Sequence, residues 1–244
     1  MRNKSGVFMI AIVLCGGKGT RLRPYTYSMP KPMLPLGKKP ILEFVVNNLK
    51  HHGFTDIFFT VGYLKEEIMD YFGDGDKFGV KITYFVEDRK EMNTAGSILP
   101  CKKFIKDTFL VVMGDHLTTI NFKKIVEFHK KKKGIATMAL KRSGLPLEYG
   151  IAALDKNNMI VKFEEKPIIQ NLVNAGIYAL EPEIFNYIRS GYDFSLDVFP
   201  GLLADKKKMY GYVFDEYWMD IGRVPDYESL HQIISIIDLA TRAR

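Results

Sequence analysis

The sequence predicts a three-layer α/β/α fold of the Rossmann-like kind, with a mostly parallel central sheet and an antiparallel extension. Apolar, β-branched runs alternate with amphipathic segments over the first 140 residues, which is typical of strand–helix–strand units. The first such run has no polar alternation, as expected for a strand covered on both faces. Beyond residue 140, strand-like runs follow one another closely, which indicates hairpins at one edge of the sheet.

The first part of the chain alternates strands and helices. Its expected strands are apolar runs at residues 9–14, 57–61, 81–86, 109–113 and 135–140. Its expected helices are amphipathic segments at residues 41–50, 65–72, 94–105 and 122–132. Pro40 precedes the first helix, and Gly73 and Gly134 follow the second and the fourth. Pro100 should distort the third.

The second part begins with a hairpin. Strand-like residues 149–154 and 159–163 flank the turn sequence Asp155-Lys156-Asn157-Asn158. Further strands are expected at residues 173–180 and 209–214. Helices are expected at residues 182–189, 196–204 and 225–240.

The composition is that of a folded globular protein with one large domain or two small ones. The chain has 244 residues, of which 47% are hydrophobic and 26% charged, so disordered, collagen-like and disulfide-scaffold classes are excluded. No apolar run reaches about 18 residues, so no membrane span is expected. Cys15 and Cys101 lack a nearby second cysteine, which favours free thiols in a reducing compartment and a cytoplasmic location. The short apolar stretch before Cys15 fits a first strand better than a signal peptide.

The charge favours an anionic partner. The formal net charge is +7, which suits nucleic acid, an acidic membrane or a phosphorylated small molecule. Lysine runs at residues 130–133 and 206–208 follow helix-like segments, where lysine stabilises the last turn. No aromatic residues interleave with these runs, so we expect no nucleic-acid partner.

A glycine-rich segment follows the first strand as Gly16-Gly17-Lys18-Gly19-Thr20-Arg21-Leu22. Glycines let the backbone approach a ligand, and successive N–H groups can hold phosphate. The segment is neither a Walker A loop nor a dinucleotide fingerprint, because its lysine precedes the last glycine and Leu22 stands where a third glycine belongs. It predicts a phosphate loop of another kind with Arg21 as its cation. A glycine-rich turn that binds no ligand is the alternative interpretation.

Three more charged positions fit phosphate chemistry. Pro30 and Pro32 flank Lys31 and bias it to an extended conformation that aims its ammonium group. Asp115 follows an apolar strand, and Asp220 follows Tyr217-Trp218-Met219. If the two carboxylates meet beside a triphosphate, they form a hard oxygen site suited to Mg²⁺. The alternative interpretation of Lys31 is a surface turn, and that of each aspartate is a helix cap or a turn.

Two further segments could bind hydroxyl groups. Glu165 and Lys166 lie together at a strand end and could bind a hydroxyl and an anion, and the amide of Asn174 could bind hydroxyls. A solvated strand end is the commoner explanation of each.

Taken together, the motifs resemble the sugar-phosphate nucleotidylyltransferase family, which includes mannose-1-phosphate guanylyltransferases and glucose-1-phosphate thymidylyl- and uridylyltransferases. The matching segments lie in order over nearly the whole chain, at residues 14–24, 30–33, 114–115, 165–167, 174–178 and 218–222. The resemblance implies one domain of the nucleotide-diphospho-sugar transferase fold over residues 1–244. It divides this domain into a nucleotide-binding half at about 1–120, a sugar-binding half at about 121–222 and a closing helix at about 224–240.

The resemblance also implies the roles of individual residues. The nucleotide would contact Leu14, Gly16, Gly17, Gly19, Thr20, Arg21, Lys31, Glu87, Asp88, Asn93 and Thr94. The sugar phosphate would contact Gly150, Glu165, Lys166 and Asn174. Asp115 and Asp220 would bind Mg²⁺, and the catalytic set would be Arg21, Lys31, Asp115, Lys166 and Asp220. The substrates would be an NTP and a sugar 1-phosphate, whose oxygen attacks the α-phosphorus without a protein nucleophile.

The sequence favours one base over the others. Glu87 and Asp88 compete for the base-contacting place, because the spacer that follows is one residue longer than in relatives. Either carboxylate matches the N1–H and N2–H₂ donors of guanine, whereas an amide suits uracil or thymine better. Asn93 stands where the family usually has glycine; asparagine tolerates a left-handed backbone, but its side chain could crowd the base. The segment Thr94-Ala95-Gly96-Ser97 that follows resembles the mannose-1-phosphate enzymes. We therefore expect a mannose-1-phosphate guanylyltransferase, with a glucose-1-phosphate thymidylyl- or uridylyltransferase as the alternative.

Rival classes and assembly stay open at this point. A catalytically inactive regulatory subunit would share the fold, but it would not need all of the charged motifs. The family's C-terminal β-helix of hexapeptide repeats is not expected in this chain, nor is its acetyltransferase activity. We expect the apolar stripe of the closing helix, at Leu230, Ile233, Ile234 and Ile237, to pack against the chain's own sheet, with a homo-oligomer interface as the alternative.

Overall fold

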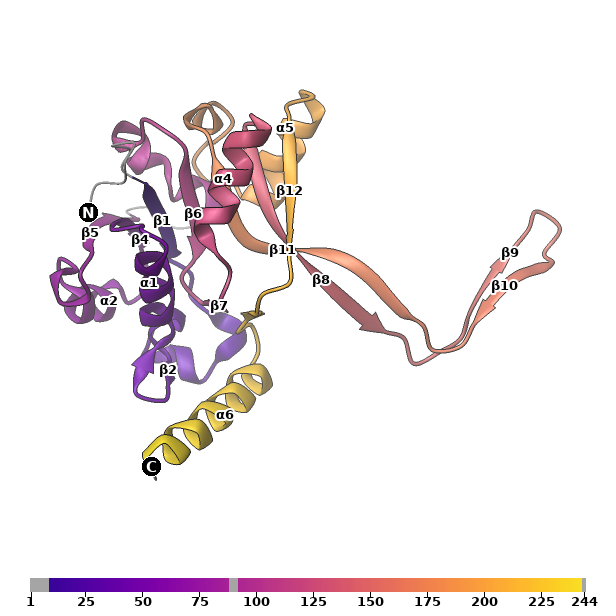
Figure 1. The fold of residues 1–244 in the computed structure, drawn as a ribbon, viewed down its shortest axis with the longest axis horizontal. Coiled ribbons are helices and arrows are strands. Elements are labelled where there is room, and N and C mark those ends of the chain that lie inside the picture. The colour runs from indigo at the N-terminus through magenta and orange to yellow at the C-terminus, as the bar shows by residue number, and fades with distance from the viewer. Residues whose placement is uncertain (1–8, 88–91, 243–244) are drawn as a thin grey trace.

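A seven-stranded sheet is the centre of the fold, and its strand order is β12-β8-β11-β6-β1-β4-β5 (Figure 1). The computed structural model describes residues 9–87 and 92–242. β11 is antiparallel to both of its neighbours, and the other pairs are parallel, so the predicted sheet type is confirmed. The strands are Ile10–Cys15 (β1), Asp56–Val61 (β4), Lys81–Val86 (β5), Phe109–Met113 (β6), Ala136–Pro146 (β8), Ile168–Leu180 (β11) and Met209–Phe214 (β12).

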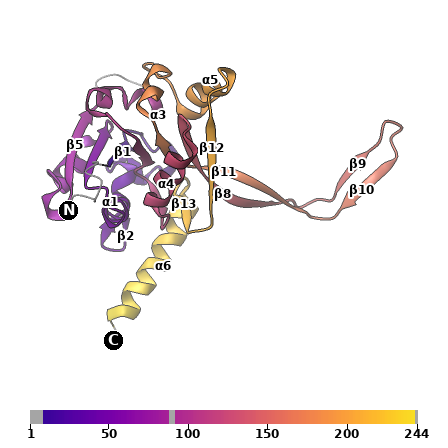
Figure 2. The ribbon, with the colours of Figure 1, turned by 45° about the horizontal axis from the view of Figure 1, so that its top comes forward.

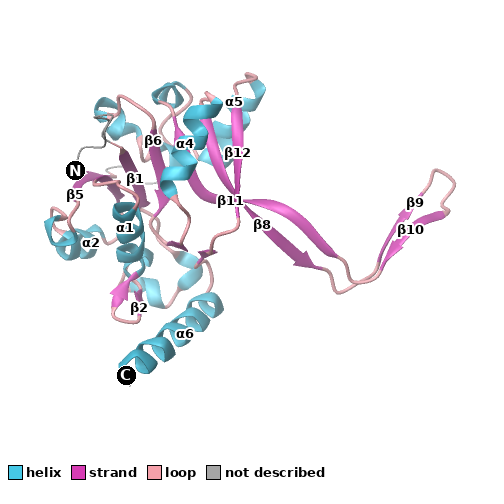
Figure 3. Cartoon of the chain, in the orientation of Figure 1, coloured by secondary structure: helices cyan, strands magenta, loops and turns pink. Residues whose placement is uncertain are grey.

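Helices cover both faces of this sheet, as the three-layer prediction requires (Figure 3). Ala11 and Val13 of β1 share a buried cluster with residues of Ile41–His51 (α1), Lys65–Phe72 (α2) and Phe122–Lys132 (α4). Ile12 belongs to a second cluster on the other face, with residues of Asn93–Gly96 (α3) and Phe199–Ala204 (α5). Because successive strand residues face opposite sides, a strand buried on both sides is apolar throughout.

Three predicted helices are wrong in form. The helix expected at 94–105 is the short α3 followed by a 3-10 segment, Leu99–Phe104, because Pro100 lacks the N–H that a continuous helix needs. The helix expected at 182–189 is a 3-10 turn, Pro182–Asn186. The helix expected at 196–204 is a π-helical turn, Phe194–Val198, that leads into α5.

Short strand pairs and the last helix lie outside the main sheet. His116–Thr118 (β7) pairs antiparallel with Trp218–Asp220 (β13), and Pro35–Leu36 (β2) pairs with Lys39–Pro40 (β3). The final helix, Val224–Arg242 (α6), buries Tyr227 and Leu230 in a third cluster with Leu22, not against the central sheet. Among residues 9–87 and 92–242, no helix combines the length and the apolar character needed to cross a membrane.

The predicted hairpin lies at the end of a long two-stranded ribbon. β8 and β11 continue beyond the sheet as a pair, and Ile151–Leu154 (β9) and Ile160–Glu164 (β10) form the far end (Figures 1 and 2). The pairing of β9 with β10 confirms the hairpin. The continuous β8–β11 pairing beyond the sheet was not predicted.

The sheet itself indicates where a ligand binds. β1 lies between β4 and β6 in the sheet. β4 is the next strand of this sheet along the chain, and β6 extends the sheet on the other side of β1. Ligands of open parallel sheets bind outside the carboxyl ends of the strands, where the strand order changes direction in this way. The glycine-rich segment follows β1, and Asp115 follows β6, so both predicted motifs lie at this place.

Candidate active site

The glycine-rich segment forms a tight loop at the end of β1. Gly19 has a left-handed backbone (φ 59°), and Thr20–Leu22 makes one 3-10 turn that buries Leu22. The hydroxyl of Thr26 donates to the carbonyl of Gly19 at 2.8 Å and fixes the loop from outside. The turn leaves Thr20 and Arg21 exposed at the pocket.

We predict that Gly19→Ala destabilises the protein by about 1–2 kcal/mol, the scale of forcing an L-residue into a left-handed backbone. A Cβ at this position would lie 3.0 Å from side-chain carbons of both Lys31 and Thr26. Gly17→Ala is the matched control, because its Cβ would meet no atom within 4 Å. Urea unfolding of the two variants measures the difference, and equal stabilities would contradict the prediction.

Lys31 is aimed into the site by a turn that the sequence did not predict. The extended conformation expected from Pro32 is wrong, since Lys31–Met33 forms a 3-10 turn. The Met33 N–H donates to the Pro30 carbonyl at 2.8 Å, and the Leu34 N–H donates to the Lys31 carbonyl at 3.1 Å. These two hydrogen bonds outweigh the local preference of a residue before proline.

The two aspartates meet at the Lys31 ammonium group, 105 residues apart in the chain. Lys31 Nζ lies 2.5 Å from Asp115 Oδ2 and 3.2 Å from Asp220 Oδ1. Asp115 follows β6, and the pairing of β13 with β7 brings Asp220 beside it. The sequence could not show this convergence, on which the predicted roles of all three residues depend.

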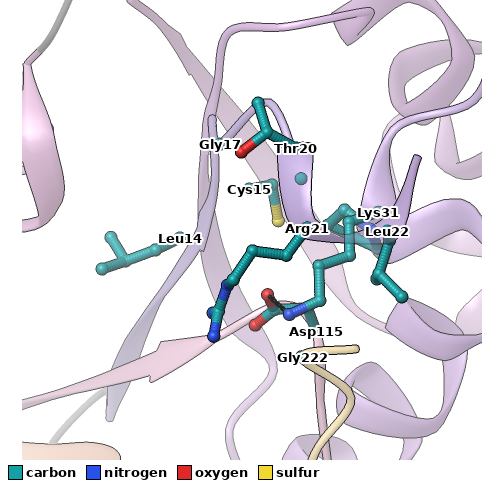
Figure 4. Close-up of a pocket in the computed structure, with 11 residues that line it drawn as sticks. Leu14, Cys15, Gly17, Thr20, Arg21, Leu22, Lys31, Asp115 and Gly222 are labelled. Atoms are coloured by element: carbon teal, nitrogen blue, oxygen red, sulfur yellow. Dashed lines mark ion pairs between the residues drawn. The ribbon is translucent and has the colours of Figure 1, made fainter. Parts of the chain in front are cut away.

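A pocket of about 210 Å³ opens beside this cluster. Figure 4 shows Arg21 and Lys31 extending from the loop and the turn toward Asp115. Arg21 also approaches Asp220, because both its Nη1 and an Asp220 oxygen lie within 3.3 Å of the Cβ position of Gly222. The lining residues are Leu14, Cys15, Gly17, Gly19, Thr20, Arg21, Leu22, Lys31, Pro32, Asp115 and Gly222.

His116 and Trp218 belong to the site, and sequence reasoning missed both. His116 Nε2 lies 3.5 Å from Asp220 Oδ1 and 3.7 Å from Asp115 Oδ1. Its Nδ1 donates to the Ala175 carbonyl at 3.1 Å, and the Trp218 indole N–H donates to the same carbonyl at 2.9 Å. The two rings meet edge to face at 5.5 Å. Their positions in the sequence could have indicated this role, because His116 directly follows Asp115 and Trp218 lies two residues before Asp220.

The electrostatics of the site keep Asp115 charged and Cys15 neutral. Burial alone would raise the pKa of Asp115, but His116 and the Lys31 ammonium group outweigh burial and hold this pKa below its ordinary value. Burial raises the pKa of the Cys15 thiol well above its usual range, and the nearby Asp115 and Glu87 raise it further. A protonated thiol is a poor nucleophile, so Cys15 lines the pocket without attacking.

One of the residues predicted near the base, Glu87, lies beside the loop. The Glu87 carboxylate occupies the space where a Gly16 side chain would lie and is 3.3 Å from the Cβ position of Gly62. Burial raises the pKa of Glu87. Asp88, the competing candidate, lies outside the described residues. Gly16 therefore has to be glycine for Glu87 to reach this place.

Asn93 and Thr94 hold a neighbouring loop. Asn93 has the left-handed backbone expected of it (φ 51°), and its amide donates to the Gly191 carbonyl at 2.7 Å. Thr94 donates from its hydroxyl to Asp193 at 2.7 Å and accepts the Phe194 N–H at 3.0 Å. The Asn93 amide is thus engaged with Gly191, and the base contacts predicted for both residues remain a prediction.

The structure separates the four predicted sugar residues. Asn174 lies where the ribbon leaves the body of the protein, and its amide donates to Tyr178 Oη at 2.9 Å while its Oδ1 accepts the Gly176 N–H at 2.9 Å. Gly150, Glu165 and Lys166 lie between the outer ends of β8 and β11 and the β9–β10 pair, which Figure 1 shows far from the body. The ribbon therefore does not bring these three to the pocket of the same chain.

The comparisons with known proteins identify the family. The family described as "Nucleotidyl transferase" matches residues 10–235. The chain belongs to this family. Its resemblance to sugar-phosphate nucleotidylyltransferases, drawn above from the motifs, is confirmed.

Individual nucleotidyl transferases show how far the similarity extends. A UTP–glucose-1-phosphate uridylyltransferase of Synechocystis is 40% identical over 90% of this chain, which spans 61% of that relative. A D-glycero-α-D-manno-heptose 1-phosphate guanylyltransferase of Campylobacter jejuni is 37% identical, with 90% of this chain and 97% of the relative covered. The crystal structure of HddC from Yersinia pseudotuberculosis has the same fold, with a TM-score of 0.74 at 24% identity over 92% of this chain and 99% of that one.

Proposed function

We propose that the protein transfers a nucleoside monophosphate from an NTP to a sugar 1-phosphate and releases pyrophosphate. The meeting of Lys31 with Asp115 and Asp220 beside a glycine-rich loop carries this proposal. The sugar phosphate oxygen forms a new bond to the α-phosphorus, and the bond from that phosphorus to pyrophosphate breaks. Such a step depends on positioning and charge neutralisation more than on acid–base groups. Arg21 and Lys31 supply these from the protein side.

The two carboxylates fit a divalent cation. Asp115 and Asp220 both direct an oxygen at one point, now taken by the Lys31 ammonium group, and oxygen ligands suit Mg²⁺. Within the described part of the chain, no group of three His, Cys, Asp or Glu side chains forms a metal site, so substrate oxygens and water would complete the coordination. Bound Mg²⁺ would offset negative charge on the phosphate oxygens.

For the substrates, we propose GTP and mannose 1-phosphate. Glu87 supports guanine, because a carboxylate accepts both N–H donors on the guanine edge, and it lies against Gly16 of the loop. The Campylobacter relative, whose length the chain nearly matches, is named a guanylyltransferase acting on a manno-configured sugar phosphate. The Synechocystis relative is the reason to test UTP and glucose 1-phosphate as the second candidates.

A substrate matrix tests both levels of the proposal. Each of the four ribonucleotides and dTTP is combined with hexose 1-phosphates and Mg²⁺, and released pyrophosphate is measured. We expect release to require both substrates and to be fastest with GTP and mannose 1-phosphate. A clear preference for UTP or dTTP would replace the base assignment. Absence of release from every pair would contradict the transferase proposal and favour a regulatory subunit.

A further inference from the structure

The part of the ribbon beyond the sheet, residues 141–174, is exposed over most of its length, although Pro167 is buried. It extends away from the body in both views (Figures 1 and 2). Every residue of β9 and β10 is exposed. A two-stranded ribbon is marginally stable alone in water, and exposed apolar strands readily pair with other chains. We call residues 141–174 the arm.

The arm has one apolar face and one charged face. The register of β9 with β10 places Leu154, Ile160 and Phe163 on one face, where 55%, 61% and 64% of their surface is exposed. The opposite face, called the charged face, carries the ion pair of Lys162 with Glu164 at 3.2 Å, beside Ile151, of which 38% is exposed. An exposed ion pair of this kind is stable in water, whereas burial of the three large apolar side chains would lower the free energy.

Two of the predicted sugar residues, Gly150 and Glu165, lie on the apolar face. Continuing the register places Glu165 opposite Gly150 on the side of Phe163. The contacts agree, because a Cβ at Gly150 would lie 2.6 Å from Glu165 Oε2 and 2.6 Å from Phe163 Cζ. The apolar face, which is stabilised by contact with a partner, therefore also carries Glu165. Lys166 follows Glu165 directly in the chain.

The arm carries these residues away from their own pocket. Asn174, at the base of the arm, is followed by Ala175, whose carbonyl contacts His116. Ile168 is six residues further out on β11, roughly 20 Å at about 3.3 Å per residue, and Lys166 lies beyond it. This separation exceeds the reach of a lysine side chain, so the arrangement does not deliver Lys166 to the pocket of the same chain.

The pocket is incomplete without such residues. Its volume of about 210 Å³ is below the roughly 300–1,000 Å³ of most ligand sites. Among its lining residues the cations are Arg21 and Lys31, and Lys31 is already paired with two carboxylates. Two polyanionic substrates need a further positive group at the acceptor side.

We propose that the arm docks on a second copy of this chain and places Glu165 and Lys166 at the sugar-phosphate side of that copy's pocket. The second copy is the occupant that the observations favour, because it offers a pocket lacking these two residues. Reciprocal exchange of arms covers both apolar faces in one two-fold interface. The assignment of sugar phosphate as the ligand rests on the proposed function, whereas the exchange of arms does not.

Complementation between two defective variants tests the shared site. Lys31→Ala damages the pocket and Lys166→Ala damages the arm, and we expect each alone to lose at least about 10²-fold in turnover. The two are co-expressed with different tags, and the mixed dimer is purified through both tags. One of its two sites then combines an intact pocket with an intact arm, so the mixed dimer recovers about half of the wild-type activity. Activity at the single-variant level, with the wild type active, would overturn the proposal in favour of an arm that folds back on its own pocket.

The molar mass in solution tests the exchange of arms independently of the proposed function. Light scattering should give a dimer for the wild type at micromolar concentration. Phe163→Glu, which places a charge on the apolar face, should weaken dimerisation at least about tenfold. Lys162→Gln, on the charged face, should leave the dimer intact. A monomeric wild type would overturn arm exchange whatever the activity, and a dimer disrupted by Phe163→Glu would support it even if no nucleotide sugar is formed.

Discussion

Lys31→Ala is expected to lower turnover by at least about 10²-fold, the usual scale for loss of one electrostatic stabiliser. The Lys31 ammonium group is buried and lies between Asp115 and Asp220 at 2.5 and 3.2 Å. Without it, two carboxylates face the incoming phosphates with one cation fewer, so the reacting groups repel each other. Pyrophosphate release with saturating substrates measures the effect. Lys38→Ala, which removes an exposed lysine shortly after the same turn, should keep near-normal turnover.

Lys31 should contribute to stability as well as to chemistry. Lys31→Met should destabilise the protein, because two partly buried carboxylates lose their partner. Adding Asp115→Asn removes one of those charges, so the double variant should regain part of the lost stability in urea unfolding. The double variant is used for stability alone, because Asp115 is itself a proposed site residue. Near-normal turnover in Lys31→Ala itself would refute the assigned role.

Asp220→Ala is expected to reduce turnover by a similar factor of at least about 10². Asp220 is held at the site by the β7–β13 pair, and its Oδ1 lies 3.2 Å from Lys31 Nζ. If Asp220 helps to bind Mg²⁺, its loss also raises the Mg²⁺ concentration that gives half-maximal rate. Titration of Mg²⁺ at saturating NTP and sugar 1-phosphate measures this concentration directly.

The control for Asp220 lies five residues earlier in the chain. Asp215 is 91% exposed at its side chain, so Asp215→Ala removes an equal charge without touching the pocket. Its turnover and Mg²⁺ requirement should match the wild type. A normal Mg²⁺ requirement in Asp220→Ala, with turnover lowered, would assign Asp220 to positioning Lys31 rather than to the metal.

Much of the first half of the fold could be predicted because most of its strands are buried on both faces. Residues 57–61 and 109–113 are apolar runs bounded by turns, and residues 81–86 form a half-buried edge strand. The strands at all three places are confirmed with nearly the same limits. The helix expected at 65–72 and the one at 122–132 are confirmed as α2 and α4. In each case local pattern and global burial agree, which is the condition under which sequence reasoning works.

The continuation of β8 and β11 into the arm could not be predicted, for the opposite reason. Its strands contain polar and small residues such as Lys141, Arg142 and Gly144, and no core imposes a two-residue pattern on them. The helix expected at 94–105 failed because Pro100 interrupts the backbone hydrogen bonds. Hydrophobic periodicity arises from burial against a core, so it cannot predict a strand that pairs outside the core.

The candidate site was predicted in part. The glycine-rich loop, Arg21, Lys31 and the two aspartates could be selected by residue type and by the family resemblance, and the structure brings them together. His116 was missed because its role depends on a strand pair of three residues, which is too short for any periodicity. Glu165 and Lys166 were selected as site residues, but their place on the arm depends on how two strands extend beyond the sheet.

Trp218 gives the protein a built-in optical reporter. It is the one tryptophan in the sequence, two residues before Asp220, with its indole edge to face with His116. Its emission therefore arises from a single place, and a change in the charge or hydration around the aspartates should alter its intensity or wavelength. Binding of nucleotide can be followed in the unlabelled protein, including in variants that no longer turn over.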